Sequence, residues 1–347
     1  MSNLIKKIQN NIFQQSLFVR GDGLVLGISG GPDSVCLLEI FAKLQKKYNL
    51  KLILAHVNYE LRGKESDGDQ KLVEDIAQKY GLELFILKPN KALTPTLSLK
   101  RARGSKFPSE ESLRNIRYDF FEKIRRESGC DHIAVAHTLD DQVETFLMRL
   151  LRGAGLSGLS GMKFKNGPAS TCGNATSTQG GKIIRPLLNV SKKDILEFLK
   201  TQKIVYRTDR TNKTNKFFRN KIRNKLIPIL EKDFNPNIKE TIFKSSLSIL
   251  DDYSLLSSMA ETECAKIFFK EGVGSVRKIL ELPESLQKMV LREVIGEKKD
   301  NLRDIDAAHV EEILKALKSS KSKSQKVFFK GLKIVRNGDK ITISELV

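Results

Sequence analysis

The hexapeptide SGGPDS at residues 29–34 combines the residue types that a phosphate-binding loop needs. The apolar run at 24–28 before it predicts a buried strand, and the run at 35–41 after it predicts the start of a helix. Glycines without a β-carbon allow a ligand to approach the backbone closely, and the N–H groups at a helix start attract an anion. The sequence therefore predicts a phosphate cradle at this strand-to-helix turn.

The same hexapeptide lacks the lysine with which a Walker loop reaches the β- and γ-phosphates of a nucleotide. Ser29 and Ser34 offer hydroxyl donors instead. The carboxylate of Asp33 would repel a phosphate, and a Mg²⁺ ion bound there removes that repulsion. A plain Gly-Pro-Asp turn capped by Ser34 is the alternative, and for a bare SGG it is the better interpretation. The complete hexapeptide between a strand and a helix favours a nucleotide cradle with Mg²⁺ at Asp33.

Three further places carry polar side chains where a predicted strand ends or a predicted helix begins: 56–62, 137–144 and 185–186. In an open parallel sheet, the carboxyl ends of the strands meet at one edge, where the ligand crevice lies. We therefore expect these segments and the SGGPDS loop to build a single site.

The elements that must position this site alternate between strand and helix. Apolar runs at 24–28, 52–57, 84–87 and 132–137 predict strands, and periodic segments between them predict helices. This alternation predicts an α/β domain with a parallel sheet covered by helices on both faces. It stops near residue 235, after which the chain predicts helices and a closing hairpin at 327–343. We therefore expect a domain at 1–234, with an N-terminal helix, and a smaller, mainly helical domain with a C-terminal β-hairpin at 235–347.

Charge indicates a polyanionic partner. The chain of 347 residues has a formal net charge of +20, and residues 191–240 hold 14 Lys/Arg against 6 Asp/Glu. An excess of positive charge of this size favours RNA or DNA over a lipid surface as the partner. No apolar stretch approaches the ~20 residues that span a bilayer, so we expect no membrane partner.

The cysteines indicate neither a disulfide framework nor a zinc site, because Cys36, Cys130, Cys172 and Cys264 are widely scattered. The N-terminus lacks a secretory signal, so a cytoplasmic location is expected. The acid-free basic segment at 88–108 is interpreted as a flap over RNA or, nearly as well, as a solvated loop. The Gly/Ser/Thr/Asn tract at 166–181 predicts a flexible loop.

The ordered motifs resemble those of the N-type ATP pyrophosphatases, the PP-loop superfamily, and are most similar to its lysidine-forming tRNA ligases. They are SGGPDS at 29–34, HVNYELR at 56–62, ESLRNIRY at 111–118, AHTLDDQVET at 136–145, RGAG at 152–155, IRPL at 184–187, DRTN at 209–212 and RNKIR at 219–223. Tyr59 departs from the family pattern, which has a histidine there, and 166–181 looks like an insertion.

The resemblance implies a PP-loop ATPase domain of the adenine nucleotide alpha hydrolase type, followed by a compact tRNA-binding domain. It also implies ATP-dependent joining of free L-lysine to the wobble cytidine of a tRNA(Ile) with a CAU anticodon. The cytosine 2-carbonyl oxygen is first adenylated, and the lysine side-chain amine then displaces AMP. ATP and Mg²⁺ are the implied cofactors, and the sequence leaves open whether the protein forms a homodimer.

The resemblance also implies roles for single residues. The implied nucleotide-binding residues are Ser29, Gly30, Gly31, Asp33, Ser34 and His56, with the metal at Asp33. The implied catalytic residues are Asp33, Arg114, Asp141 and Glu144, of which the last two accept the ammonium groups of the lysine substrate. The implied tRNA contacts are Arg152, Arg185, Arg219 and Arg223.

Plainer interpretations stay open at this point. His56 and His137 end predicted strands and could simply pack, Arg114 could pair with Glu111 in its own helix, and Asp141 could merely favour a helix start. A tRNA thiolase is the alternative within the superfamily, although these cysteine spacings supply no obvious thiol pair. A non-catalytic tRNA-binding module is the alternative outside the enzymes.

Overall fold

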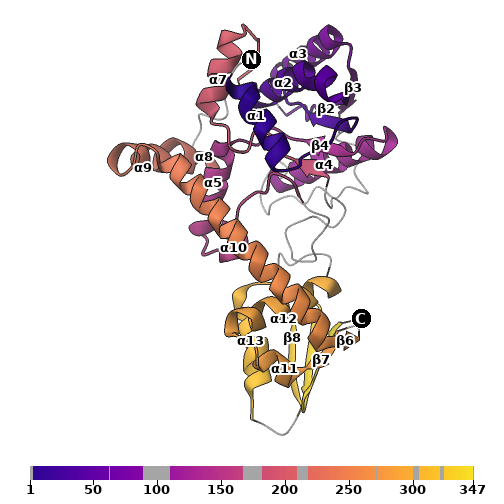
Figure 1. Cartoon of the computed structure of the whole chain (residues 1–347), viewed down its shortest axis with the longest axis vertical. Helices are drawn as coiled ribbons and strands as arrows, with labels where there is room; N and C mark the ends of the chain where they lie inside the picture. Colours follow the sequence, from indigo (N-terminus) through magenta and orange to yellow (C-terminus); the bar gives the residue numbers. More distant parts are fainter. Residues whose placement is uncertain are drawn as a thin grey trace. The chain divides into compact units, whose positions relative to one another are not determined.

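The computed structural model describes residues 3–61, 63–88, 110–166, 182–208, 218–270, 272–299, 305–320 and 324–346 (Figure 1). The chain divides into two compact units, here called the first and second units. The first contains Met1–Asn166 and Lys182–Ser246, and the second contains Gly167–Gly181 and Leu247–Val347. The hypotheses about 88–108 and 166–181 fall almost entirely on segments outside the described residues.

The first unit contains a parallel sheet in the order β3-β2-β1-β4-β5. Its strands are β1 (Gly23–Gly27), β2 (Lys51–Val57), β3 (Glu83–Leu87), β4 (His132–Ala134) and β5 (Ile183–Ile184). The expected parallel sheet is therefore confirmed. Strand β4 ends earlier than the apolar run at 132–137 predicts, because Val135 to His137 already lead into the next helix.

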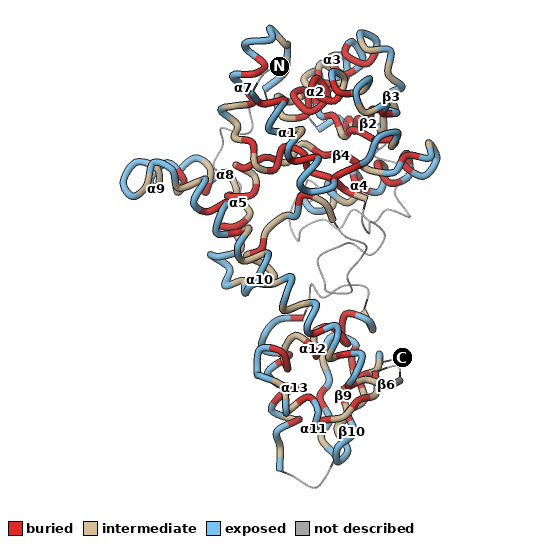
Figure 2. Tube along the Cα trace, in the orientation of Figure 1, coloured by how far each residue is buried: buried red, intermediate tan, exposed pale blue. Residues whose placement is uncertain are grey.

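Helices pack on both faces of this sheet, and Figure 1 shows α2 (Pro32–Tyr48) and α4 (Glu110–Glu127) on opposite sides of it. Alternate residues of a strand point to opposite faces. Val25 and Ile53 accordingly belong to one buried cluster with Phe121 of α4. Buried residues concentrate along β1, β2 and α2 (Figure 2). The central strand that leads into the SGGPDS loop is thus fixed from both sides.

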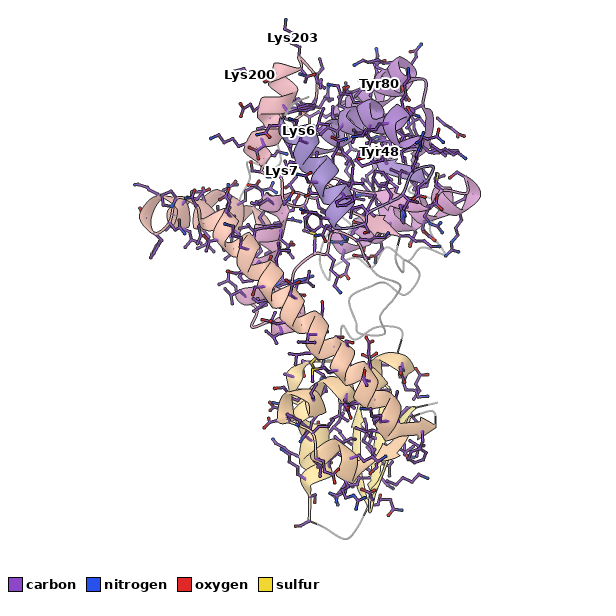
Figure 3. The ribbon with its side chains drawn as sticks, viewed as in Figure 1. Lys6, Lys7, Tyr48, Tyr80, Lys200 and Lys203 are labelled. Atoms are coloured by element: carbon purple, nitrogen blue, oxygen red, sulfur yellow. The ribbon has the colours of Figure 1, made fainter. Side chains whose placement is uncertain are left out.

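The remaining helices of the first unit connect and cover these elements. They are α1 (Asn3–Gln14), α3 (Lys64–Tyr80), α5 (Leu139–Leu150), α6 (Leu156–Leu159), α7 (Lys192–Thr201), α8 (Phe218–Lys221), the π-helical turn η2 (Ile222–Leu226), α9 (Ile227–Asp233) and the first part of α10 (Ile238–Ile267). Two tyrosines labelled in Figure 3 anchor α2. Tyr48 packs edge-on against Phe18, and Tyr80 donates to Glu39 Oε2 at 2.6 Å.

The second unit contains an antiparallel sheet in the order β6-β7-β10-β9-β8. Its elements after α10 are β6 (Phe268–Lys270), β7 (Val273–Ser275), α11 (Val276–Leu280), α12 (Glu284–Lys298), α13 (Ala307–Lys318), β8 (Gln325–Phe329), β9 (Leu332–Asn337) and β10 (Lys340–Glu345). The hairpin expected at 327–343 is present as part of β8–β10. It extends into a larger sheet because β7 pairs with β10.

The division between the units falls at Ser246/Leu247, inside α10. The sequence placed the domain boundary at 234/235, where the Asn-Pro-Asn segment interrupts the α/β alternation. The two positions differ because the start of α10 belongs to the first unit: Lys239 there binds Asp140 at 3.1 Å, and the buried Ser246 binds Gln142.

Candidate active site

The SGGPDS loop joins β1 to α2 and is held by its own serine hydroxyls. The Ser29 N–H donates to Ser34 Oγ at 3.1 Å, and Ser34 Oγ donates to the Gly31 carbonyl at 3.0 Å. Gly30 has a φ of +81°, and a β-carbon there would lie 3.3 Å from the Asp69 carbonyl oxygen. The loop therefore has the compact strand-to-helix form that the sequence predicts, and Gly30 occupies a position that a side chain would strain.

Asp33, in the first turn of α2, is paired with a lysine that the sequence reasoning missed. Both carboxylate oxygens of Asp33 lie 2.5 Å from Lys192 Nζ. Burial raises the pKa of Asp33, whereas the charge of Lys192 acts to lower it. Lys192 is the first residue of α7, and the only signal nearby was the Ser191 cap, which marks where the helix begins and not where the lysine side chain points.

Lys192 also links the loop to α5. Its backbone N–H donates to Asp140 Oδ2 at 2.7 Å while its side chain binds Asp33. The charges of Asp140 and Asp141 act on Asp33. The structure therefore brings the SGGPDS segment and the 137–144 segment together at the carboxyl edge of the sheet, as expected.

A second cation that the sequence reasoning missed borders the loop. The backbone N–H of Arg207 donates to the Gly30 carbonyl at 3.0 Å, and the side-chain Nε of Arg207 lies 2.6 Å from Asp69 Oδ1. Arg207, from the segment after α7, thus flanks the SGGPDS loop. The loop precedes a helix start, and a helix start favours anions.

His56 is buried at the end of β2, and its Nδ1 lies 2.8 Å from the Ile28 carbonyl oxygen. Burial lowers the pKa of His56, which favours a neutral ring that donates from Nδ1. The Nε2 atom is buried and has no hydrogen-bond partner among the described residues. His56 therefore holds the backbone of Ile28, the residue that precedes the loop.

Asp141 is the N3 residue of α5 and forms a capping box with Thr138. Asp141 Oδ2 accepts from the Thr138 N–H at 2.9 Å, and its Oδ1 lies 2.9 Å from Arg219 Nη2. Burial acts to raise the pKa of Asp141, but the charge of Arg219 and the hydrogen bonds from Thr138 hold it below its usual value. Asp141 is thus a helix cap and a charged carboxylate at the same time.

Glu144 lies one turn further along α5 and is 1% exposed. Its Oε2 accepts from Arg219 Nε at 2.6 Å, and its Oε1 accepts from Arg223 Nε at 2.5 Å. Both arginines were expected to contact tRNA, and both carboxylates were expected to receive the ammonium groups of lysine. The structure places the two sets in contact with each other, so arginines of the chain pair with both carboxylates.

Arg114, His137 and Arg185 lie within electrostatic reach of one another and of Asp141. Arg114 is exposed on α4, with its guanidinium 5.3 Å from the centre of the Tyr118 ring. His137 is close enough for the charges of Arg185 and Arg114 to act on it, and burial together with these charges lowers its pKa. Arg114 thus presents an exposed cation beside His137 and the buried Arg185.

Arg185 differs most from the sequence expectation. It is 4% exposed, and its Nη1 donates to the Lys163 carbonyl at 2.8 Å and to Asn166 Oδ1 at 2.9 Å. This buried position corrects the expectation of a surface contact with RNA. Arg152, in contrast, is exposed, with its guanidinium 5.7 Å from the centre of the Phe218 ring.

Tyr59 stands where the family pattern has a histidine. Its hydroxyl donates to the Leu113 carbonyl at 2.6 Å and accepts from Arg117 Nε at 3.3 Å. It therefore ties the segment after β2 to α4, the helix that carries Arg114.

No group of three or more His, Cys, Asp or Glu side chains able to hold a metal occurs among the described residues. Cys36, Cys130 and Cys264 are buried free thiols, and Cys172 lies outside the described residues. Burial raises the pKa of Cys36 and of Cys264 to about 12, which makes both thiols poor nucleophiles. Within the described ranges, no helix is long and apolar enough to cross a membrane.

The parallel sheet, with SGGPDS between β1 and α2 and carboxylates on α5, defines a PP-loop nucleotide-binding domain. The family described as "PP-loop domain" matches residues 2–230. The tRNA(Ile)-lysidine synthase of Clostridium tetani is 33% identical over 324 residues, which cover 92% of this chain and 65% of that protein. The enzyme of the same name from Clostridioides difficile is 30% identical over 345 residues, which cover 98% and 70%. The chain belongs to the PP-loop family and, within it, to the tRNA(Ile)-lysidine synthases.

The chain thus spans about two thirds of the length of these relatives, 65% and 70%. Among solved structures, the U34-tRNA thiolase NcsA from Methanococcus maripaludis, with its [4Fe-4S] cluster, aligns with a TM-score of 0.57. That alignment covers 72% of this chain and 78% of NcsA at 21% identity, and it shows a shared fold.

Proposed function

We propose that this protein uses ATP to join free L-lysine to the wobble cytidine of a tRNA(Ile) with a CAU anticodon, forming lysidine. The observation that carries the proposal is the junction at Lys192, which binds Asp33 of the SGGPDS loop and Asp140 of α5. This junction joins the SGGPDS loop to a helix whose carboxylates pair with cations, which supports a site for both phosphate and an amine. Family membership and the net charge of +20 support the same substrates.

In the first step, the cytosine 2-carbonyl oxygen attacks the α-phosphorus of ATP, and pyrophosphate leaves. A ring carbonyl is a poor leaving group until it becomes an ester of AMP. The proposed role of the SGGPDS loop is to hold the pyrophosphate end, where its backbone stabilises the charge that develops. The exposed guanidinium of Arg114 is proposed to bind the α-phosphate or the adenylate, since its planar shape suits a bidentate contact.

The residues of the loop fit a Mg²⁺ ion that arrives together with the nucleotide. Mg²⁺ is usually bound by one or two carboxylates and by substrate phosphates. Asp33, at the start of α2 and 27% exposed, provides such a carboxylate. The bound cation would neutralise charge on the departing pyrophosphate.

In the second step, the side-chain amine of lysine attacks C2 of the adenylated cytosine. The C2–N bond forms, the C2–O bond breaks, AMP leaves with the oxygen, and the amine loses a proton. Asp141 and Glu144 are proposed to hold the ammonium groups of lysine. Their present partners, Arg219 and Arg223, show that this position accepts positive charge.

The tRNA is proposed to contact exposed cations of the first unit together with the second unit. Arg152 is one such cation, and Arg219 and Arg223 become available to phosphates if lysine takes over their carboxylates. Figure 3 shows further basic side chains, Lys6 and Lys7 on α1, Lys200 in the last turn of α7, and Lys203 just after that helix.

The test supplies ATP, labelled lysine and the CAU-bearing tRNA(Ile), and measures AMP, pyrophosphate and the mass of the wobble nucleotide. We expect lysidine at that position and AMP release that depends on both lysine and tRNA. AMP release that needs neither substrate contradicts the proposal. Asp33→Ala should abolish the product while largely sparing tRNA affinity, which separates an enzyme from a binding module.

A thiolase is less well supported, because the described cysteines are buried singly. Replacing Cys36, Cys130, Cys172 and Cys264 together by alanine addresses this alternative. Lysidine formation by the folded variant excludes a cysteine-dependent reaction.

A further inference from the structure

Lys192 reaches the SGGPDS loop from a segment far away in sequence. Its Nζ lies 2.5 Å from both carboxylate oxygens of Asp33, 159 residues earlier in the chain. The side chain of Lys192 is 39% exposed and that of Asp33 is 27% exposed, so solvent reaches both groups. The pair therefore lies at the surface of the loop, where a ligand can meet it.

The backbone of Lys192 is fixed while its side chain is free to change partner. Its N–H is bound to Asp140, and the preceding Ser191 caps α7 by accepting from the Asp194 N–H at 3.1 Å. The lysine stem has several rotatable bonds and ends in a compact charge with three donors. Its ammonium group can thus exchange one anion for another nearby without movement of α7.

Phosphate binding at the SGGPDS loop requires a positive charge close to Asp33. Phosphate oxygens that enter beside Asp33 add negative charge to a place that already has Asp140 and Asp141 close by. A Walker loop provides a lysine for the β- and γ-phosphates within its own motif, and SGGPDS does not. Lys192 provides the missing donor from a different element.

We propose that Lys192 is the phosphate-binding lysine of this loop: it pairs with Asp33 in the nucleotide-free protein and donates to the β- and γ-phosphates when ATP binds. This inference rests on the proposed function only in taking ATP as the ligand. It assigns Lys192 to nucleotide binding and does not require that tRNA or lysine be the other substrates.

The test measures the Kd of Mg·ATP, of inorganic pyrophosphate with Mg²⁺ and of AMP by calorimetry, without tRNA or lysine. Lys192→Met should raise the Kd of ATP and of pyrophosphate about tenfold or more, as expected for a lost hydrogen bond between charged groups. The Kd of AMP should be unchanged. Lys192→Arg, which keeps a charged donor, should retain most of the affinity. Lys193→Met is the matched control, because Lys193 is the exposed neighbour on the same helix turn.

Two results would overturn the inference. One is Lys192→Met binding ATP as well as the wild type or better, which would make the lysine a mere counter-ion for Asp33. The other is an equal loss for AMP, or an equal loss in Lys193→Met, which would indicate a general effect of charge. Thermal melting establishes that each variant is folded, and Lys192→Gln replaces the methionine variant if that one unfolds. A wild-type protein that forms no lysidine but needs Lys192 for ATP contradicts only the proposed function.

Discussion

Nε of Arg219 lies 2.6 Å from Oε2 of Glu144, a residue 75 positions earlier in the chain. Glu144 is buried on α5, and Arg219 comes from α8, so the contact fixes one helix to the other. Arg223, one helical turn later, binds the other oxygen of the same carboxylate. The charge of Glu144 is therefore satisfied within the chain, and an incoming ammonium group must compete with guanidinium groups for it.

The first prediction concerns Glu144 itself. Glu144→Gln removes the charge that balances Arg219 and Arg223, and breaking a buried ion pair from one side destabilises a protein. We expect the free energy of unfolding to fall by about 2–3 kcal/mol and the KM for lysine to rise about tenfold or more. Urea denaturation and steady-state kinetics measure the two effects.

The matched control for Glu144→Gln is Glu127→Gln, since Glu127 forms an exposed pair with Lys123 at 3.8 Å. Exposed pairs contribute roughly 0–1 kcal/mol, so this control should change little. An unchanged KM for lysine in Glu144→Gln would remove this carboxylate from the lysine site.

The second prediction concerns competition at the same carboxylates. Arg219→Gln removes one guanidinium, while Glu144 keeps Arg223 and Asp141 keeps its bonds to Thr138. We expect the KM for lysine, measured at saturating tRNA, to fall about fivefold, which corresponds to ~1 kcal/mol. Arg126→Gln, at an exposed arginine paired with Glu122, is the control and should leave this KM unchanged. A higher KM in Arg219→Gln means that the arginine assists lysine binding.

The third prediction concerns the loop backbone. Gly30→Ala places a side chain at a φ of +81° and a β-carbon 3.3 Å from the Asp69 carbonyl oxygen. Gly129→Ala is the control, because Gly129 has a φ of +66° but no atom within 4 Å of the added carbon. Both variants should lose about 1 kcal/mol of stability from backbone strain. Only Gly30→Ala should also lose ATP affinity, and equal ATP binding by the two variants would contradict the assignment of the loop.

The fourth prediction concerns pH. Burial, reinforced by Arg185, lowers the pKa of His137 below its usual 6.5, so the ring is neutral in the folded protein. As the pH falls below about 6.5, the unfolded chain binds a proton that the folded protein excludes. The contribution of His137 to the free energy of unfolding is therefore complete above that pH, and it declines by up to about 1.4 kcal/mol per pH unit below it.

His137→Asn removes this titration. Its stability should fall less steeply than that of the wild type between pH 6.5 and 5, when urea midpoints are compared across this range. Parallel curves for the two proteins would show that folding does not lower the pKa of His137.

The local sequence was sufficient to predict the elements that are formed by residues close together in the chain. The apolar run, the SGGPDS turn and the helix that follows are contiguous, so the order of strand, turn and helix was predictable, although β1 is Gly23–Gly27 and α2 already begins at Pro32. Thr138 and Asp141 form a cap for the same reason, since the hydrogen bonds join positions three residues apart. The parallel sheet followed from the alternation of such segments.

Only the tertiary structure decided which polar side chains meet. Lys192 binds Asp33, and Arg219 binds Glu144, through contacts between residues 159 and 75 positions apart. Arg185 resembled an RNA contact in sequence but is buried under the segment at 163–166. Hydrophobic periodicity specifies which face of an element turns inward, whereas an ion pair depends on where packed elements place two charges. The sequence by itself therefore determined the loop, the sheet and the chemical class of the site, and the packing of α5, α7 and α8 determined which cations occupy its carboxylates.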